Sequence, residues 1–512
     1  MTRALRGLLV AACAATQRSR DQWSLDLCGA ELRSRTWIRG GLGAGPPISW
    51  RDAQPSERGR ATEPLVVIGS VDSGLDLTGS TLGLLSVGVF VLAYVLVVLE
   101  DVIHLRKSKP VVIAAGVIWL FAAIAIHAGV PAEHQPKVEE LVQHHVAEFG
   151  ALFLFLMVAM TYISAIARRN VFLKINAKLL SAGLGYRAVF WTTGALSFVI
   201  SPVADNLTTA LLMGAVATTV GRGSPRFISL ACINIVVAAN AGGAFSPFGD
   251  ITTLMVWQAG KVETLQFFQL LLPSIVNWLV PAVLMSFALP KGRPTSAASE
   301  VDLLPGWLAV IVMFVATIAT AVVFHTSFGL PPFLGMTTGL GYLMLWSYVR
   351  RRLAHRKGDD SAVDVFENVA EVEWDTLLFF FGVILCVGAL GELGYLHLAS
   401  SWLYGTDGSQ ATMANVGVGL ISAVLDNVPV MLAVLGMNPN MGDGSTEAVH
   451  QWLLVTLTAG VGGSLLSVGS AAGVALMGSA RGQYTFFSHL RWTPAVALGY
   501  VASIATHAWL NG

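Results

Sequence analysis

The sequence predicts an all-α polytopic membrane protein built on an inverted-topology repeat, and three observations support this prediction. Of its 512 residues, 54% are hydrophobic and only 12% are charged, whereas about 25% are charged in an ordinary soluble domain. Many apolar segments approach the roughly 20 residues that a helix needs to cross a bilayer. Finally, one short polar motif occurs twice, each time inside an apolar segment that it interrupts.

Residues 1–60 differ from the rest of the chain. They contain ten arginines and no lysine, and no apolar stretch long enough to span a membrane. An Arg-rich, Ser-containing leader of this kind resembles an organelle transit peptide. We therefore predict that residues 1–60 are a targeting segment outside the fold; a disordered tail is the alternative.

Eight apolar segments predict plain membrane crossings, and four interrupted segments bring the expected total to about ten full crossings and two hairpins. Residues 79–129 form the predicted N-terminal scaffold, and residues 305–349 form a connecting scaffold. The plain crossings are 79–100, 111–129, 149–167, 265–289, 305–324, 331–349, 375–394 and 489–510. The interrupted segments are 188–220, 227–260, 411–436 and 450–480.

The positions of Lys and Arg predict how the interrupted segments enter the membrane. Loops 168–187 and 221–226 are both positively charged, so both should face the inner side. Segment 188–220 lies between them and is therefore predicted to be a re-entrant hairpin. The chain from Gly358 to Ala480 has no Lys or Arg, so hairpin 411–436 should open outward. Repeat 1 (149–289) and repeat 2 (375–510) thus have opposite orientations.

The two predicted hairpins share a motif. Positions 201–206 read SPVADN and positions 422–427 read SAVLDN, so Asp205 corresponds to Asp426 with a constant offset in numbering. Matched breaks in inverted halves are the best sequence indication of a transporter's substrate site.

The offset that relates Asp205 to Asp426 also relates the two interrupted helices that follow the hairpins. Glycine and proline at these breaks allow the backbone to unwind and to line a cavity. Asp250 falls opposite Ala471 under this offset, so we expect the two halves to be chemically unequal. The other matched positions are Gly242 with Gly463 and Ser246 with Ser467.

Asp205 and Asp426 are the strongest candidate functional residues. An ionised carboxylate in apolar surroundings is costly unless it is paired, hydrated or bound to a cation. Such a group can exchange a proton for a small cation, which is the chemistry of an antiporter. A neutral Asp that caps the second helix of each hairpin is the alternative role.

Asn206 and Asn427 follow these carboxylates and offer amide oxygens, which are hard ligands for a small cation. We therefore predict a Na⁺ site formed by Asp205, Asn206, Asp426 and Asn427. Nearby hydroxyls can add ligands, although a hydrogen bond to the local helix is the alternative for each of them. These hydroxyls belong to Ser201, Ser422, Thr208 and Thr209.

Three further acids lie at predicted helix starts and are candidate proton or gating groups. Glu148 opens segment 149–167, and Glu373 and Asp375 open segment 375–394. Complementing the helix dipole is the alternative role for each of them. We expect most histidines to lie at the membrane interface, where solvation accounts for their positions better than metal ligation does. These histidines are His104, His127, His134, His144, His145, His325 and His507.

The composition also excludes several classes of protein. Lys plus Arg equals Asp plus Glu, 31 against 31, so no nucleic-acid partner is expected. The four cysteines, Cys13, Cys28, Cys232 and Cys386, have no CxxC spacing and are expected to be buried thiols. An intramembrane aspartyl protease would need a GxGD signature, which is absent. We expect no enzyme activity and no cofactor.

At SPVADNLTTALLM (201–213) and NAGGAFSPFGDITTLMVWQ (240–258), the chain closely resembles the NhaD family of sodium/proton antiporters, within the ion-transporter superfamily. The resemblance covers the chain from about position 80 to position 510. It implies electrogenic exchange of Na⁺ or Li⁺ for H⁺, and relatives in this superfamily commonly form homodimers in the lipid bilayer. With the Arg-rich leader, it also implies an organellar membrane, the plastid envelope, with the plasma membrane as the alternative.

The resemblance further implies which residues bind ions or exchange protons. Ser246, from the first interrupted helix, is our own addition to the residues that the resemblance implies. Glu148, Glu373 and Asp375 carry over as possible proton or gating acids. The implied residues are Ser201, Asp205, Asn206, Asn240, Asp250, Thr252, Thr253, Ser422, Asp426, Asn427, Ser464 and Ser467.

Two alternatives stay open, an anion transporter of the same architecture and a passive sodium channel. A transporter of dicarboxylate, sulfate or arsenite would need helix N-termini or cations at mid-membrane rather than three aspartates. A passive sodium channel could use the same ligands. We expect the main competition between proton and cation to take place at Asp205, Asn206 and Asp250, with Asp426 and Asn427 completing the site.

Overall fold

The computed structural model describes residues 76–292, 301–355, 364–405, 408–442 and 445–511. All described residues belong to one compact unit. The predicted leader at residues 1–60, with Cys13 and Cys28, lies outside them.

Every regular element in the described ranges is helical, which confirms the prediction of an all-α chain. Among the described residues, seven helices are long and apolar enough to cross a bilayer, so the chain is an integral membrane protein. They are α2 (Thr81–Val98), α4 (Ser108–Gly129), α5 (Val138–Arg168), α9 (Pro225–Gly243), η2 with α11 (Gln266–Ser286), α12 (Trp307–Phe328) and α15 (Trp374–Glu392).

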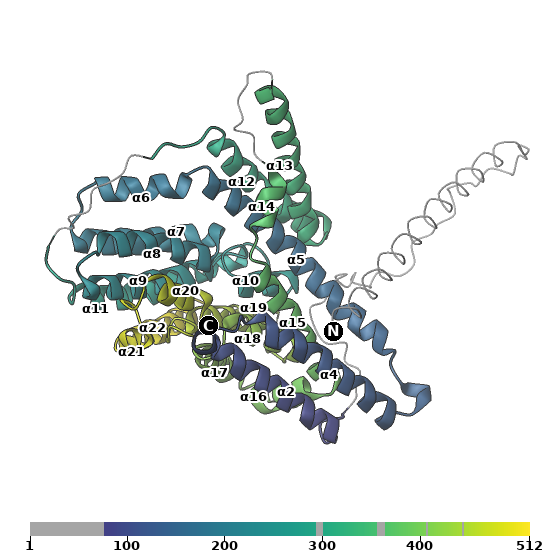
Figure 1. Cartoon of the computed structure of the whole chain (residues 1–512). Helices are drawn as coiled ribbons and strands as arrows, with labels where there is room; N and C mark the ends of the chain where they lie inside the picture. The colour runs from purple at the N-terminus through teal and green to yellow at the C-terminus, as the bar shows by residue number, and fades with distance from the viewer. Residues whose placement is uncertain (1–75, 293–300, 356–363, 406–407, 443–444, 512) are drawn as a thin grey trace, which may run out of the picture. The chain divides into compact units, whose positions relative to one another are not determined.

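The other described helices connect or flank these seven (Figure 1). In the first half they are α3 (Glu100–Ile103), η1 (Ala132–His134), α6 (Val171–Ser181), α7 (Tyr186–Ala204), α8 (Asn206–Val220) and α10 (Ile251–Gln258). In the second half they are α13 (Pro332–His355), α14 (Val365–Ala370), α16 (Tyr395–Tyr404), α17 (Ala411–Ser422), α18 (Asn427–Met437), α19 (Ser445–Gly462), α20 (Ala471–Ser479), α21 (Phe486–Leu490) and α22 (Thr493–Asn511).

The helices pack in a pattern that repeats. Helix α7 packs on α9 and α17 packs on α19, so each half pairs the first helix of its Asp-Asn motif with the first part of its broken helix. Figure 1 shows α7, α8 and α9 side by side. The second parts cross over between the halves, because α8 packs on α20 and α18 packs on α10. Four other pairs, α2 with α4, α4 with α15, α11 with α22, and α12 with α13, also pack extensively.

Close backbone approaches explain several glycines at the breaks. A Cβ atom on Gly242 would lie 2.3 Å from the carbonyl oxygen of Phe198, and one on Gly462 would lie 2.2 Å from that of Gly419. Any side chain at these positions would therefore push the two helices apart. Phe198 and Gly419 differ in residue number by the same offset as Asp205 and Asp426. The two glycines do not, because Gly242 pairs with Gly462 and not with Gly463.

The repeat therefore changes register between the hairpin and the broken helix. Gly243 faces Gly249, and Gly463 faces Gly469 in the same way, which again shortens the offset by one. The prediction of a constant offset is wrong for the broken helices, because repeat 2 has one residue fewer before its break. The predicted pairs Gly242 with Gly463 and Ser246 with Ser467 are displaced by one position. The structural partner of Asp250 is Ser470, not Ala471, and each of the two caps the helix that follows it.

Helix α5 also differs from its prediction. It begins at Val138, so Glu148 lies well inside it and does not open a helix. The polar residues before Glu148 continue the helix because two of them, His144 and His145, pair with the Glu148 carboxylate one turn later.

Candidate functional site

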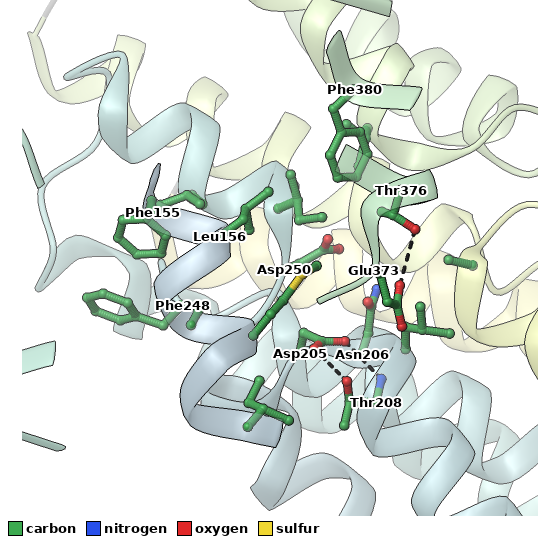
Figure 2. Close-up of a pocket in the computed structure, with 18 of the residues that line it drawn as sticks. Phe155, Leu156, Asp205, Asn206, Thr208, Phe248, Asp250, Glu373, Thr376 and Phe380 are labelled. Carbon is green, nitrogen blue, oxygen red and sulfur yellow. Dashed lines mark hydrogen bonds between the residues drawn. The ribbon is translucent and has the colours of Figure 1, made fainter. Parts of the chain in front are cut away.

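A cavity of about 220 Å³ lies where four helices begin. The starts of α8, α10, α18 and α20 all contribute to its wall, and α5 and α15 close its sides. Figure 2 shows Asp205, Asn206, Asp250 and Glu373 around it, with Phe155 and Phe248 on its apolar wall. Asp426 and Asn427 complete the polar wall, so the cavity brings together both copies of the repeated motif.

The converging helix starts give this cavity a positive potential. Each helix N-terminus carries about +0.5 of an elementary charge, so four of them supply about two positive charges. Three aspartates face this potential: Asp205, Asp250 and Asp426. The helix dipoles therefore offset much of the cost of placing carboxylates here.

Asp205 connects α7 to α8 in an unusual backbone conformation, with φ of 55°. A residue other than glycine is strained at positive φ unless local contacts hold its backbone there. Its carboxylate caps α8 by accepting hydrogen bonds from the Thr208 amide at 2.9 Å and the Thr208 hydroxyl at 2.8 Å (Figure 2). The predicted capping role is thus present, and the carboxylate also lines the cavity.

Asp250 links the two repeats. It caps α10 in a capping box with Thr253, and its side chain is only 4% exposed. The Asn427 amide donates to its Oδ2 atom at 2.7 Å. An amide from repeat 2 is therefore the main side-chain partner of a carboxylate from repeat 1.

Asp426 has a different environment from its repeat partner Asp205. Its Oδ1 atom is buried and has no hydrogen-bond partner among the described residues. Its Oδ2 atom lies 3.7 Å from the Nζ atom of Lys107, which precedes α4. Asp426 is thus paired with a cation that belongs to the protein.

A chain of side-chain amides and hydroxyls connects the two broken helices. Asn206 donates to Asn240 Oδ1 at 3.0 Å, and Asn240 donates to the hydroxyls of Ser464 at 2.8 Å and Ser470 at 3.1 Å. All four side chains are buried. Three of the predicted residues therefore meet in one network, together with Ser470, which was not predicted.

Several predicted hydroxyls donate to backbone carbonyls, and those of Ser201 and Ser422 bond a neighbouring helix rather than their own. Ser201 donates to the Ala239 carbonyl at 2.6 Å, and Ser422 donates to the Ala459 carbonyl at 2.7 Å. These two bonds occupy equivalent places in the repeats. In the same way, Ser246 donates to the Pro202 carbonyl, and Thr253 donates to the carbonyls of Ser246 and Asp250.

Other hydroxyls are buried without any hydrogen-bond partner in the described part of the chain. They include the hydroxyls of Thr252, which follows Asp250 at the start of α10, of Ser467 in the break of repeat 2, and of Thr209 in the first turn of α8. A buried hydroxyl without a partner is costly, so each is suited to a ligand or a water molecule. All three were candidates from the sequence, Thr252 and Ser467 as residues that the resemblance implies and Thr209 as a nearby hydroxyl.

The predicted gating acids lie in different parts of the structure. Glu373 lines the cavity and accepts from the Thr376 hydroxyl at 3.1 Å (Figure 2). Asp375 instead lines a neighbouring cavity of about 370 Å³ and accepts from the Ser108 hydroxyl at 2.5 Å.

Glu371 also lines the main cavity, although it was not predicted. The guanidinium group of Arg168, followed by the Ser164 hydroxyl, lowers the pKa of Glu371 from its ordinary value. This carboxylate therefore stays ionised and bound to the end of α5.

Glu148 belongs to a separate buried cluster. His145 Nδ1 lies 3.1 Å from a Glu148 oxygen, and His145 Nε2 lies 3.5 Å from Glu392 Oε1. The predicted interfacial place of His145 is wrong, because it is 3% exposed inside α5 and is held there by two acids; His507 is also buried. None of these residues lines the cavity that contains Asp205.

Sequence reasoning missed Lys107, Ser470, Glu371 and Glu392. In the sequence, Lys107 is one of several loop charges that set membrane orientation, and its contact with Asp426 joins the first scaffold helices to repeat 2. Ser470 could have been found from its position, because Ser followed by an apolar run is a helix-cap signal.

Comparisons with known proteins agree with the family resemblance. Residues 80–460 match a family model described as a citrate transporter. The chain is 52% identical over 458 residues to "Na(+)/H(+) antiporter NhaD" of Alkalimonas amylolytica, covering 85% of this chain and 92% of that protein. It is 50% identical to the protein of the same name from Vibrio cholerae, covering 88% of this chain and 96% of the relative. It is 29% identical to "Sodium/proton antiporter 1" of Arabidopsis thaliana, covering 82% and 71%.

Proposed function

Because the chain belongs to the NhaD family of sodium/proton antiporters, we propose that it exchanges Na⁺ for H⁺ by letting the two ions compete for the carboxylates of the cavity. The observation that carries this mechanism is the meeting of Asp205, Asp250 and Asp426, from both repeats, in one cavity at the starts of four helices. Li⁺ has the same charge and similar ligand preferences, and we include it as a substrate.

The proposed site uses the carboxylates as the exchangeable groups. When protons leave Asp205 and Asp250, these oxygens become available to a small cation. The amide oxygens of Asn206 and Asn427, adjacent in sequence to Asp205 and Asp426, supply neutral hard ligands. Proton return from the opposite side then releases the cation, so each ion excludes the other.

The Asn240 network has a positioning role in this proposal. Its amide bridges Asn206 to the hydroxyls of Ser464 and Ser470, so it ties the first hairpin to the second broken helix. Movement of one repeat against the other would change this bridge and the Asp250–Asn427 hydrogen bond together. Both contacts therefore report on alternating access.

The membrane topology is part of the same proposal. We propose that α7 with α8 and α17 with α18 are re-entrant hairpins, and that the chain makes about ten full crossings. Residues 79–129 and 305–349 are then scaffold, and residues 149–289 and 375–510 are the inverted repeats. We also propose a homodimer in the bilayer. The bacterial relatives named above are more similar than the Arabidopsis protein, which supports a plasma membrane over the plastid envelope.

An anion transporter of the same superfamily is the competing function. Three carboxylates face the cavity, and Glu373 lies at its wall as well. An anionic substrate would be repelled by these groups, since like charges at a few ångströms destabilise each other by several kcal/mol at low dielectric. The carboxylates therefore favour a cation as the substrate.

Reconstituted vesicles with an imposed pH gradient test the proposal. Adding Na⁺ should dissipate the gradient with the wild-type protein, whereas Asp205→Asn and Asp426→Asn should each abolish this effect. Asp364→Asn is the matched control, because Asp364 is an acid paired with Arg351 away from the cavity. Sodium-dependent proton flux that survives in both Asn variants would show that the carboxylates are not the exchange site. Sodium flux without proton flux would indicate a channel instead.

A further inference from the structure

Lys107 is the one basic side chain that lines the cavity among the described residues. Its side chain is 16% exposed, that of Asp426 is 18% exposed, and the ammonium lies 3.7 Å from the carboxylate. The same ammonium lies 4.7 Å from the centre of the Phe379 ring, within the range of a cation–π contact. The lysine is thus folded inward and not directed to a membrane surface.

The start of α4 fixes this lysine in position. The Lys107 amide donates to Glu100 at 3.3 Å, and the next residue, Ser108, donates to Asp375 on α15 at 2.5 Å. Helix α4 also packs along α15. The backbone at Lys107 is therefore anchored, while its long side chain keeps several rotatable bonds.

Lys107 and Asp426 stand between two cavities. Both residues line the cavity that contains Asp205 and Asp250, and both line the neighbouring cavity of about 370 Å³. The second cavity is also lined by Glu100 and Asp375. A lysine that leaves Asp426 would find two other carboxylates on the opposite side.

The charges of the main cavity give a reason for the lysine to leave. The four helix starts contribute about two positive charges, and Lys107 contributes one. Asp205, Asp250 and Asp426 oppose these charges, and Glu371 and Glu373 line the same cavity. A Na⁺ ion that binds Asp426 within about 4 Å of the ammonium would be repelled by about 4 kcal/mol at an effective dielectric constant of about 20, unless the ammonium moves away.

We propose that the Lys107 ammonium is a tethered competitor of the transported cation at Asp426. Binding of Na⁺ displaces the ammonium from Asp426 toward Glu100 and Asp375 in the second cavity, and release of Na⁺ lets it return. Lys107 thus substitutes for the cation between transport steps, so that the partly buried charge of Asp426 is never left unpaired. This inference rests on the function proposed above.

The test compares Na⁺ dependence in Lys107→Gln, Lys107→Arg and the wild type. The half-saturating Na⁺ concentration for gradient dissipation should fall by about fivefold in Lys107→Gln, equivalent to about 1 kcal/mol, because the competitor is gone. Lys107→Arg keeps the charge and should stay close to the wild type. Lys109→Gln is the matched control, since Lys109 is an exposed lysine in the first turn of α4.

A second measurement removes the dependence on transport. Stabilisation of the purified protein by Na⁺ against heating reports binding alone, and Lys107→Met serves if the Gln variant does not accumulate. In an Asp426→Asn background the Lys107 substitution should have no further effect on Na⁺ binding. An unchanged or increased half-saturating concentration in folded Lys107→Gln or Lys107→Met protein would overturn the inference. A wild-type protein that shows no sodium-dependent proton flux would instead overturn the proposed function.

Discussion

Replacing Asp250 by Asn separates the role of its charge from its role in the fold. Asparagine has nearly the same shape and caps helices about as well as aspartate, so α10 should still begin at Ile251. Its single side-chain oxygen keeps the cap, and its NH₂ group, in the place of Oδ2, can donate to the Asn427 oxygen once the Asn427 amide turns over. Since a buried ionised carboxylate costs free energy, we expect the thermal stability of Asp250→Asn to be unchanged or higher.

The expected effect on Na⁺ binding is large. Two unit charges about 4 Å apart interact by about 4 kcal/mol at an effective dielectric constant of about 20. That energy corresponds to roughly a thousandfold in affinity. Loss of hydration on both ions offsets part of it, so we expect the half-saturating Na⁺ concentration to rise by at least about a hundredfold.

The assay pairs sodium-dependent dissipation of a pH gradient in vesicles with thermal unfolding of the purified protein. Asp250→Ser is the companion variant, because serine occupies the equivalent cap in repeat 2, at Ser470, and preserves the cap without the charge. Both variants should fold and fail to transport. Na⁺ affinity within threefold of the wild type would refute the role of this carboxylate. Lost activity together with a much lower melting temperature would show that its role is structural.

Three further predictions concern stability. Asn240→Ala removes a side chain with three hydrogen bonds and should cost about 1–3 kcal/mol, measured as a lower melting temperature. Glu371→Gln should cost at most about 1 kcal/mol at neutral pH. Because Arg168 lowers the pKa of Glu371 below its ordinary 4.5, this contribution is complete above pH 4.5 and is lost as the pH falls through the lower folded value. His145→Phe leaves the buried Glu392 without its partner and should cost about 3 kcal/mol, partly recovered by adding Glu392→Gln.

Each of these predictions has a result that contradicts it. An unchanged melting temperature in Asn240→Ala would show that water or neighbouring groups replace the amide bridge. For Glu371→Gln, a stability difference that grows in acid would have the wrong sign. A double variant at His145 and Glu392 that is no more stable than the single His145 variant would show that the two side chains are not coupled.

The repeated motif made half of the site predictable. Asp205 and Asp426 are acidic residues at equivalent breaks in the two repeats. This repetition made both of them candidate site residues from the sequence alone. The prediction of their common cavity followed from the inverted orientation of the two halves, which loop charges indicate.

The register of the broken helices could not be obtained in the same way. Repeat 2 has one residue fewer before its break, and nothing in the residue composition indicates this difference. Only the glycine contacts in the structure establish that Gly242 pairs with Gly462. The predicted partner of Asp250 is consequently wrong by one position. Hydrophobic periodicity places helix ends only to within a few residues.

Contacts between side chains that are distant in the sequence could not be predicted, for a different reason. Lys107 precedes an apolar helix, where a lysine is ordinarily a marker of membrane orientation. Only the packing of α4 on α15 directs it toward Asp426. Glu392 likewise ends an apolar helix, and nothing local indicates that His145 lies beside it.

The four helix starts that meet at the cavity also bear on how new specificities arise in this architecture. A helix N-terminus by itself attracts anions, as phosphate-binding loops show, and the family model that matches residues 80–460 is described as a citrate transporter. The backbone therefore offers a receptor for negative charge, and Asp205, Asp250 and Asp426 invert its sign. In the proposed function, a few side chains decide the charge of the transported ion, and the backbone that presents them need not differ between an anion carrier and a cation carrier.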